Sequence, residues 1–261
     1  MNVSEQRRSV FSSCYLKIER ANQHIADLDT LLSDFIKANP HRIIIHPDSE
    51  TGQVRLAVDL NKPLPAHCST ITGDAVHNLR TALDHLACAL VEAGGGVVKA
   101  HTVFPFHEDR DNFEANFEGK IEGASKEAIN LVKSMEPYKG GAGNALWRLN
   151  KLDVADKHHS LLLAIRVATL PKIIVRKPDG SVQATLINNR VGGDGRINLV
   201  RFPPGVTFEI EEQNKVPVEV RFRDTAVLEG KSVIVSLKKL SDIVLGVVQN
   251  FEGVNLQTSQ D

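Results

Sequence analysis

The chain has 261 residues, of which 42% are apolar and 24% are charged, and its formal net charge at pH 7 is −1. This composition is typical of a globular protein with one large domain or two small ones, and the near-zero charge does not indicate a dominant electrostatic partner such as bulk DNA or an anionic membrane. No apolar run approaches the length of about 18 residues that a membrane-spanning helix needs, so we expect no contact with a membrane.

The first half of the chain, up to about residue 165, is mostly helical in pattern. Residues 12–39 carry apolar side chains at alternating spacings of three and four, which predicts an amphipathic helix. Branched residues on either side of an Asp/Ser/Gly turn predict a β-hairpin at about 41–60. A second long helix is expected from about residue 65 to the glycines at 94–96. Further helices are expected to start near residues 109–111 and to cover residues 125–135 and 145–165.

The second half reads as β-structure up to about residue 227. Strands are expected within residues 172–187, 196–202, 206–212 and 216–224. An apolar stripe over residues 236–251 predicts a closing helix that docks on the bundle or the sheet. We therefore predict an α+β protein. A helical-bundle domain with the hairpin insertion, residues 1–166, is followed by a mostly antiparallel β-rich region with the closing helix, residues 167–261.

The cysteines and the N-terminus bear on the cellular compartment. Cys14, Cys68 and Cys88 lie far apart without a CxxC pair, which favours buried free thiols over disulfides or a zinc site. The N-terminal segment lacks the continuous apolar stretch of a signal peptide. We expect a cytoplasmic protein.

The second long helix carries more polar side chains than a packed helix needs. His77, Asn78, Arg80, Asp84 and His85 lie within nine residues of GDAVHNLRTALDHLACALVEAGGG. At about 100° per residue, His77, Arg80 and Asp84 share a face opposite the apolar stripe. Residues 74–91 contain no Lys or Glu, as is typical of a partly buried polar network and not of a solvated surface.

A second polar set interrupts the helix expected at residues 145–165. Asn150, Asp153 and Lys157 are spaced to lie on one side of it, and Asp156 and His158 flank them. Both helices are apolar almost all round, so we expect them to be central and to face each other. The two sets would then form one cluster with at least one hydrogen bond between the helices.

Three chemistries could use this cluster. Its His and Asp side chains suit zinc, iron or manganese, but no HExxH or Glu-x-x-His pair is present, and Arg80 and Lys157 would repel a cation, so we assign no metal ligands and no cofactor. Acid–base cleavage of RNA would use His85 or His77 for proton transfer and Arg80 to stabilise the phosphate. The third use is anion or nucleotide binding without chemistry, and a purely structural network is the alternative to all three.

The segment RTALDH, Arg80 to His85, has the R-x4-H form and resembles the signature of the HEPN superfamily. These proteins are small helical bundles, often dimeric, and many are metal-independent ribonucleases with a composite Arg/His site across the dimer. The resemblance implies a ribonuclease with Arg80 and His85 as catalytic residues, RNA as its partner and a homodimer as its assembly. We place His77 and Asp84 in the catalytic set. The supporting set contains Asn78, Asn150, Asp153, Asp156, Lys157 and His158.

A longer pattern covers about residues 73–163. HNLRTALDHLA is followed some 60 residues later by LWRLNKLDVADKHHSLL, with FPF and EPY between them. This layout resembles a group of uncharacterised bacterial proteins, which implies a bacterial protein and supplies no mechanism. Three functions stay open: a HEPN-like ribonuclease, a non-enzymatic ligand-binding or interaction protein with a structural cluster, and a metal-dependent hydrolase.

Overall fold

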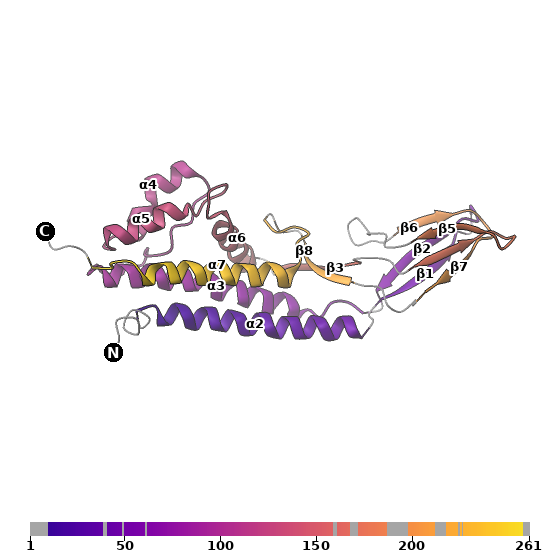
Figure 1. The fold of residues 1–261 in the computed structure, drawn as a ribbon, viewed down its shortest axis with the longest axis horizontal. Helices are drawn as coiled ribbons and strands as arrows, with labels where there is room; N and C mark the ends of the chain where they lie inside the picture. Colours follow the sequence, from indigo (N-terminus) through magenta and orange to yellow (C-terminus); the bar gives the residue numbers. More distant parts are fainter. Residues whose placement is uncertain are drawn as a thin grey trace. The chain divides into compact units, whose positions relative to one another are not determined.

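A computed structural model describes residues 10–38, 41–48, 50–60, 62–158, 161–167, 172–186, 198–211, 218–223, 225 and 227–257. The chain forms two compact units, and each is assembled from separated stretches of sequence (Figure 1). The helical unit contains Met1–Leu28, Ser69–Leu162 and Asp224–Asp261. The β unit contains Asp29–Cys68 and Leu163–Arg223.

The helices found in the described residues are α2 (Ser12–Lys37), α3 (His67–Ala93), α4 (Arg110–Lys120), α5 (Lys126–Met135), α6 (Asn144–His158) and α7 (Val233–Glu252). Local signals define several of their ends. The side chains of Asp109 and Ser125 accept backbone N–H groups at the starts of α4 and α5. At its C-terminal end α3 is followed by Gly94 and by Gly95, whose φ of 84° is a conformation that glycine adopts without strain.

In Figure 1 the long helix α2 runs alongside α7, and two hydrogen bonds join them. Ser241 of α7 donates a hydrogen bond of 2.7 Å to Asn22 of α2, and Tyr15 of α2 donates one of 2.6 Å to Glu252 of α7. The apolar stripes expected for α2 and α7 are buried, which confirms the sequence prediction. The buried residues are Ile18, Ala21, Ile25, Leu28, Leu32 and Phe35 in α2, and Leu237, Leu240, Val244, Val247, Val248 and Phe251 in α7.

The helix expected at residues 145–165 is shorter than predicted. It ends at His158, and Leu162–Val167 form strand β3, which pairs with β8 (Val218–Arg223). The backbone N–H of Leu161 donates to the side chain of Asp156 at 3.4 Å. The leucines at residues 161–163 suit a strand as well as a helix, and the strand pairs with β8.

The remaining strands form two three-stranded antiparallel sheets. One has the order β1-β2-β6 and the other the order β5-β4-β7. Their bounds are β1 (His41–Pro47), β2 (Val54–Leu60), β4 (Ile173–Arg176), β5 (Val182–Leu186), β6 (Asn198–Phe202) and β7 (Thr207–Ile210). Apolar side chains from both sheets and from β8 form one core, in which Ile43, Ile173, Val175, Phe202 and Val218 are buried. These contacts confirm the predicted α+β class.

The division at residues 166 and 167 differs from the one that the structure shows. Strand β2 of the hairpin pairs with β6, with Val54 opposite Phe202, so the hairpin interrupts the helical unit in sequence but belongs to the β unit. An isolated two-stranded hairpin is marginal in water, and the extra strand covers its edge. The closing helix belongs to the helical unit, because its apolar stripe packs on α2 and α6.

In the part of the chain that the structure describes, no helix is both long enough and apolar enough to cross a membrane.

Candidate functional site

The two polar sets of the sequence meet between α3 and α6, which run antiparallel. The carboxylate of Asp156 lies against Gly73, so a Cβ atom at position 73 would collide with it. One turn further along α3, His77 contacts Asp153, and another turn on, Arg80 contacts Asn150. The contacts move forward along α3 as they move back along α6, and the hydrogen bond predicted between the two helices is confirmed.

Arg80 is the most enclosed cation of this cluster, with only 14% of its side chain exposed. It pairs with Asp84 one turn along α3, its Nε lies 3.3 Å from the amide oxygen of Asn150, and the same atom lies 3.9 Å from Oδ2 of Asp153. The guanidinium carbon lies 5.1 Å from the ring centre of Phe106. Burial lowers the pKa of Arg80, and the negative charge of Asp153 opposes that effect.

Asp153 is the buried anion of the cluster, with 2% of its side chain exposed. Its Oδ1 lies 2.9 Å from Nδ1 of His77, and its Oδ2 lies 2.6 Å from Nζ of Lys157. The Lys157 contact is an ion pair without the angles of a directed hydrogen bond. A buried carboxylate needs a compensating positive charge. Lys157 and Arg80 supply it, which explains why the Asp153 carboxylate is tolerated there.

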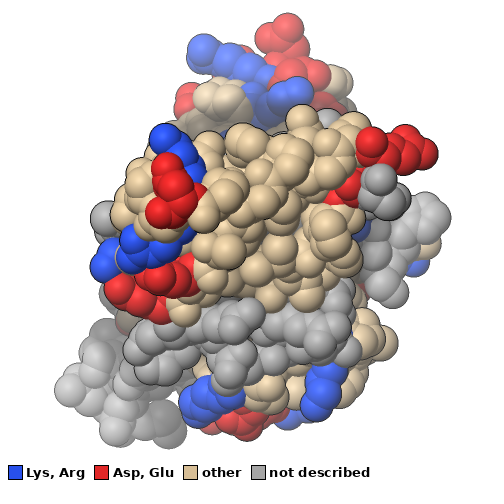
Figure 2. Space-filling model, turned by 90° about the vertical axis from the view of Figure 1, so that its right-hand side faces the viewer, with Lys and Arg blue, Asp and Glu red and all other residues tan. Residues whose placement is uncertain are grey.

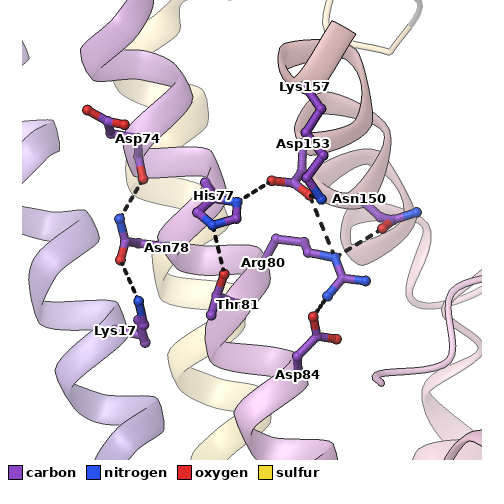
Figure 3. Close-up of polar contacts among 10 residues, drawn as sticks. All are labelled: Lys17, Asp74, His77, Asn78, Arg80, Thr81, Asp84, Asn150, Asp153 and Lys157. Atoms are coloured by element: carbon purple, nitrogen blue, oxygen red, sulfur yellow. Dashed lines mark hydrogen bonds and ion pairs between the residues drawn. The ribbon is translucent and has the colours of Figure 1, made fainter. Parts of the chain in front are cut away.

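His77 lies at the open edge of the cluster, with 54% of its side chain exposed. A carboxylate can only accept hydrogen bonds, so the Nδ1 atom that faces ionised Asp153 carries the proton. The other ring nitrogen, Nε2, lies 3.5 Å from the hydroxyl oxygen of Thr81, one turn along α3 (Figure 3). Thr81 is not among the predicted site residues, although its i,i+4 spacing from His77 places it next to that ring on the helix.

Asp84 and Asp156 occupy opposite ends of the contact. Asp84 pairs with Arg80 and accepts the backbone N–H of Phe104 at 3.0 Å, which attaches the FPF segment to α3. Asp156 lies beside Gly73, eleven residues from Asp84 along α3, which corresponds to about 16 Å of helix. Burial raises the pKa of Asp156, and the charges of Asp153 and Asp74 act in the same direction. His158 is exposed at the end of α6.

His85 and Asn78 point away from this site. Figure 3 shows His77 and Arg80 directed from α3 toward α6, while Asn78 is directed toward Lys17 of α2, whose Nζ lies 3.4 Å from the Asn78 amide oxygen. His85 follows Asn78 by two helical turns and therefore shares its face. Burial lowers the pKa of His85, and the charge of Lys17 lowers it further. The structure thus separates Arg80 from His85, the pair on which the HEPN resemblance rests.

The cluster does not supply a ready metal site. Among the residues that the structure describes, no three His, Cys, Asp or Glu side chains are grouped so that they could hold a metal ion. His77 and Asp153 provide two donors, and the neighbouring cations already share the charge of Asp153.

Comparisons of the chain with family models, with curated protein sequences and with solved structures give no significant match. The resemblance to HEPN proteins therefore stays a prediction.

Proposed function

We propose that this chain is a non-enzymatic binding or interaction protein and that its Arg/His/Asp cluster is structural. The observation that carries the proposal is the environment of Arg80. Its guanidinium is held by Asp84, Asn150 and Asp153 under the ring of Phe106, and little of it is exposed. Bonds of this kind join α3 to α6 in one register and leave few donors for a substrate.

The ribonuclease reading requires more from the same residues. Arg80 would have to release its carboxylate partners to reach a phosphate, and His85 would have to meet it there from the face that lies near Lys17. A composite site formed across a homodimer would still require Arg80 to release its carboxylate partners. The metal-dependent reading lacks a set of three donors among the described residues.

The β unit offers a surface that suits binding. The turn between β1 and β2 touches the turn between β6 and β7, because Gly52 faces Pro204. The turn between β6 and β7 also touches the turn between β4 and β5, because Gly205 faces Pro178. Figure 2 shows a broad area without charged side chains on the face toward the viewer, with Lys, Arg, Asp and Glu mainly at its margin. Protein interfaces have centres that are depleted of charge in the same way.

The test separates the structural reading from the catalytic one. Purified wild-type protein, Arg80→Ala and His85→Ala would be incubated with RNA in chelator and, in parallel, with Mn²⁺, and unfolding would be followed by circular dichroism. We expect no cleavage in either condition. We also expect Arg80→Ala to lose about 3 kcal/mol of unfolding free energy, because Asp153 would keep a buried charge with one cation fewer.

Cleavage by the wild type in chelator that disappears in both variants, with their fold intact, would replace this proposal by the ribonuclease. Cleavage that requires Mn²⁺ would replace it by the metal-dependent hydrolase. An Arg80→Ala protein as stable as the wild type would contradict the structural role of the cluster.

A further inference from the structure

His77 combines two properties that are seldom found together on one histidine. More than half of its side chain is exposed, yet its Nδ1 is held at 2.9 Å by Asp153, which is 2% exposed and belongs to another helix. The imidazole is therefore fixed from its buried side and open on the other. A loop or surface histidine without such a partner samples several rotamers.

The hydrogen bond at Nδ1 of His77 determines the chemistry that Nε2 can carry out. With the proton on Nδ1, the lone pair is on Nε2, which is the nucleophilic atom of a neutral imidazole. Nε2 lies on the side of the Thr81 hydroxyl, at 3.5 Å. Asp153 stabilises the positive charge that forms on the ring when Nε2 makes a new bond, as the carboxylate of a His/Asp pair does in general.

The charges around His77 are compatible with an incoming anion. Lys157 has 54% of its side chain exposed and lies at Asp153, and Arg80 shares the same carboxylate. Figure 3 shows the carboxylates of Asp74 and Asp84 directed away from the imidazole of His77. Two cations neutralise Asp153, and the other carboxylate whose charge interacts with His77 is that of Asp156.

We infer that His77 is a phosphoryl-acceptor site, which takes a phosphoryl group at Nε2 from a phosphoramidate or an acyl phosphate. In this step the Nε2–P bond forms while the P–N or P–O bond of the donor breaks, and the leaving group departs with that electron pair. The proton on Nδ1 stays on the ring and is shared with Asp153. Such transfer depends mainly on positioning and on charge stabilisation, and histidine is an established covalent acceptor.

The product would alter the cluster. A phosphoryl group adds close to two negative charges and three acceptor oxygens. Its oxygens would lie on the side of the Thr81 hydroxyl, which can donate a hydrogen bond to one of them. The inference goes beyond the proposed binding function, because it assigns a covalent modification to the helical unit.

Three other histidines of the chain serve as controls for the reactivity of His77. His67, His101 and His158 are also exposed, and among the described residues none of them has a hydrogen bond to a carboxylate. The folded wild-type protein would be incubated with potassium phosphoramidate at neutral pH, and the labelling rate of each histidine would be measured by mass spectrometry at alkaline pH, where phosphohistidine is retained. We expect His77 to react about tenfold faster than these three histidines, which is the value of one charge-assisted hydrogen bond.

Two variants sharpen the result. Asp153→Asn should slow the labelling of His77 about tenfold and leave that of His101 unchanged. Thr81→Val keeps the shape of the side chain without the hydroxyl and should slow His77 about tenfold, because one hydrogen bond to a charged phosphoryl oxygen is lost. A His77 that reacts no faster than His101 and His158 in the wild type would overturn the inference, and that comparison does not depend on whether a variant folds.

Discussion

In the helical unit, the contact between α3 and α6 contains a buried carboxylate, a mostly buried guanidinium and a histidine, whereas the core between the two sheets of the β unit is built from apolar side chains. The β unit has ion pairs too, but they lie on its exterior: Arg176 lies 2.8 Å from Glu209 and Lys172 lies 2.6 Å from Glu211, and both carboxylates are more than half exposed. Apolar burial stabilises without direction. The cluster, in contrast, aligns one helix with another, because each of its bonds exists in one register only.

If this comparison is correct, the largest loss of stability comes from the buried anion of the helical unit. We expect Asp153→Ala to lower the unfolding free energy by about 3–5 kcal/mol, because Arg80 and Lys157 lose a shared partner in a partly buried place. Urea denaturation at neutral pH measures this loss. Asp242→Ala on the exposed face of α7 is the matched control, and its effect should stay within about 0.5 kcal/mol. Equal losses in the two variants would mean that the cluster behaves like an exposed surface.

The close approach of the helices can be tested at Gly73. We expect Gly73→Ala to cost about 1–3 kcal/mol, because the added methyl group would displace the carboxylate of Asp156. Gly246→Ala in α7 is the control, since no atom lies near a Cβ added there, and it should stabilise by about 0.5–1 kcal/mol through helix propensity. Thermal unfolding of both variants shows whether each substitution lowers or raises the stability of the fold. A stabilising effect at position 73 would show that α6 does not lie against it.

Titration of Asp156 provides a test of the other end of the contact. Burial raises its pKa in the folded chain, so its ionisation opposes folding. The stability that this group contributes is fully present below its ordinary pKa of about 3.9 and is lost as the pH rises through the higher folded value. The isosteric Asp156→Asn variant should be more stable than the wild type at pH 7, and the difference should shrink as the pH falls toward 4. Denaturation curves across this range would contradict the prediction if the variant were less stable at pH 7.

The smallest effect is expected on the exterior of the β unit. Removing the exposed pair through Arg176→Ala should cost less than about 1 kcal/mol, because solvent screens the interaction with Glu209. The loss should shrink further in 1 M NaCl, where the Debye length is about 3 Å. Denaturation at low and high salt measures it, and Lys239→Ala, at an exposed position of α7, controls for general salt effects. A loss as large as that of Asp153→Ala would remove the distinction between the two regions.

Much of the fold could be predicted locally. The helix ends at Asp109, Ser125 and Gly94 carry capping or breaking residues that act over a few positions. The end of α6 could not be predicted in this way, because its apolar continuation suits helix and strand alike. The backbone N–H of Leu161 donates to the side chain of Asp156, and Leu162–Val167 pair with β8, a strand far along the chain.

The candidate site could be predicted in part, because the phase of a helix is a local property of the sequence. The phase of α3 places His77 and Arg80 on one face, and their partners on α6 were expected from that phase. The R-x4-H spacing of Arg80 and His85 carried no such information about direction. On a helix, five residues correspond to a turn of about 140° between the two side chains, so they approach different neighbours.

The sequence by itself determined the α+β class, the amphipathic helices and the residues that carry the polar cluster, because each of these depends on periodicity or capping within a few residues. The tertiary structure alone decided that the hairpin joins the later strands, that α7 belongs to the bundle, and that Arg80 is enclosed while His77 stays open. These outcomes depend on contacts between distant residues, such as the bond from His77 to Asp153 across 76 positions. Contacts at that separation are set by how whole elements pack, and no local pattern encodes them.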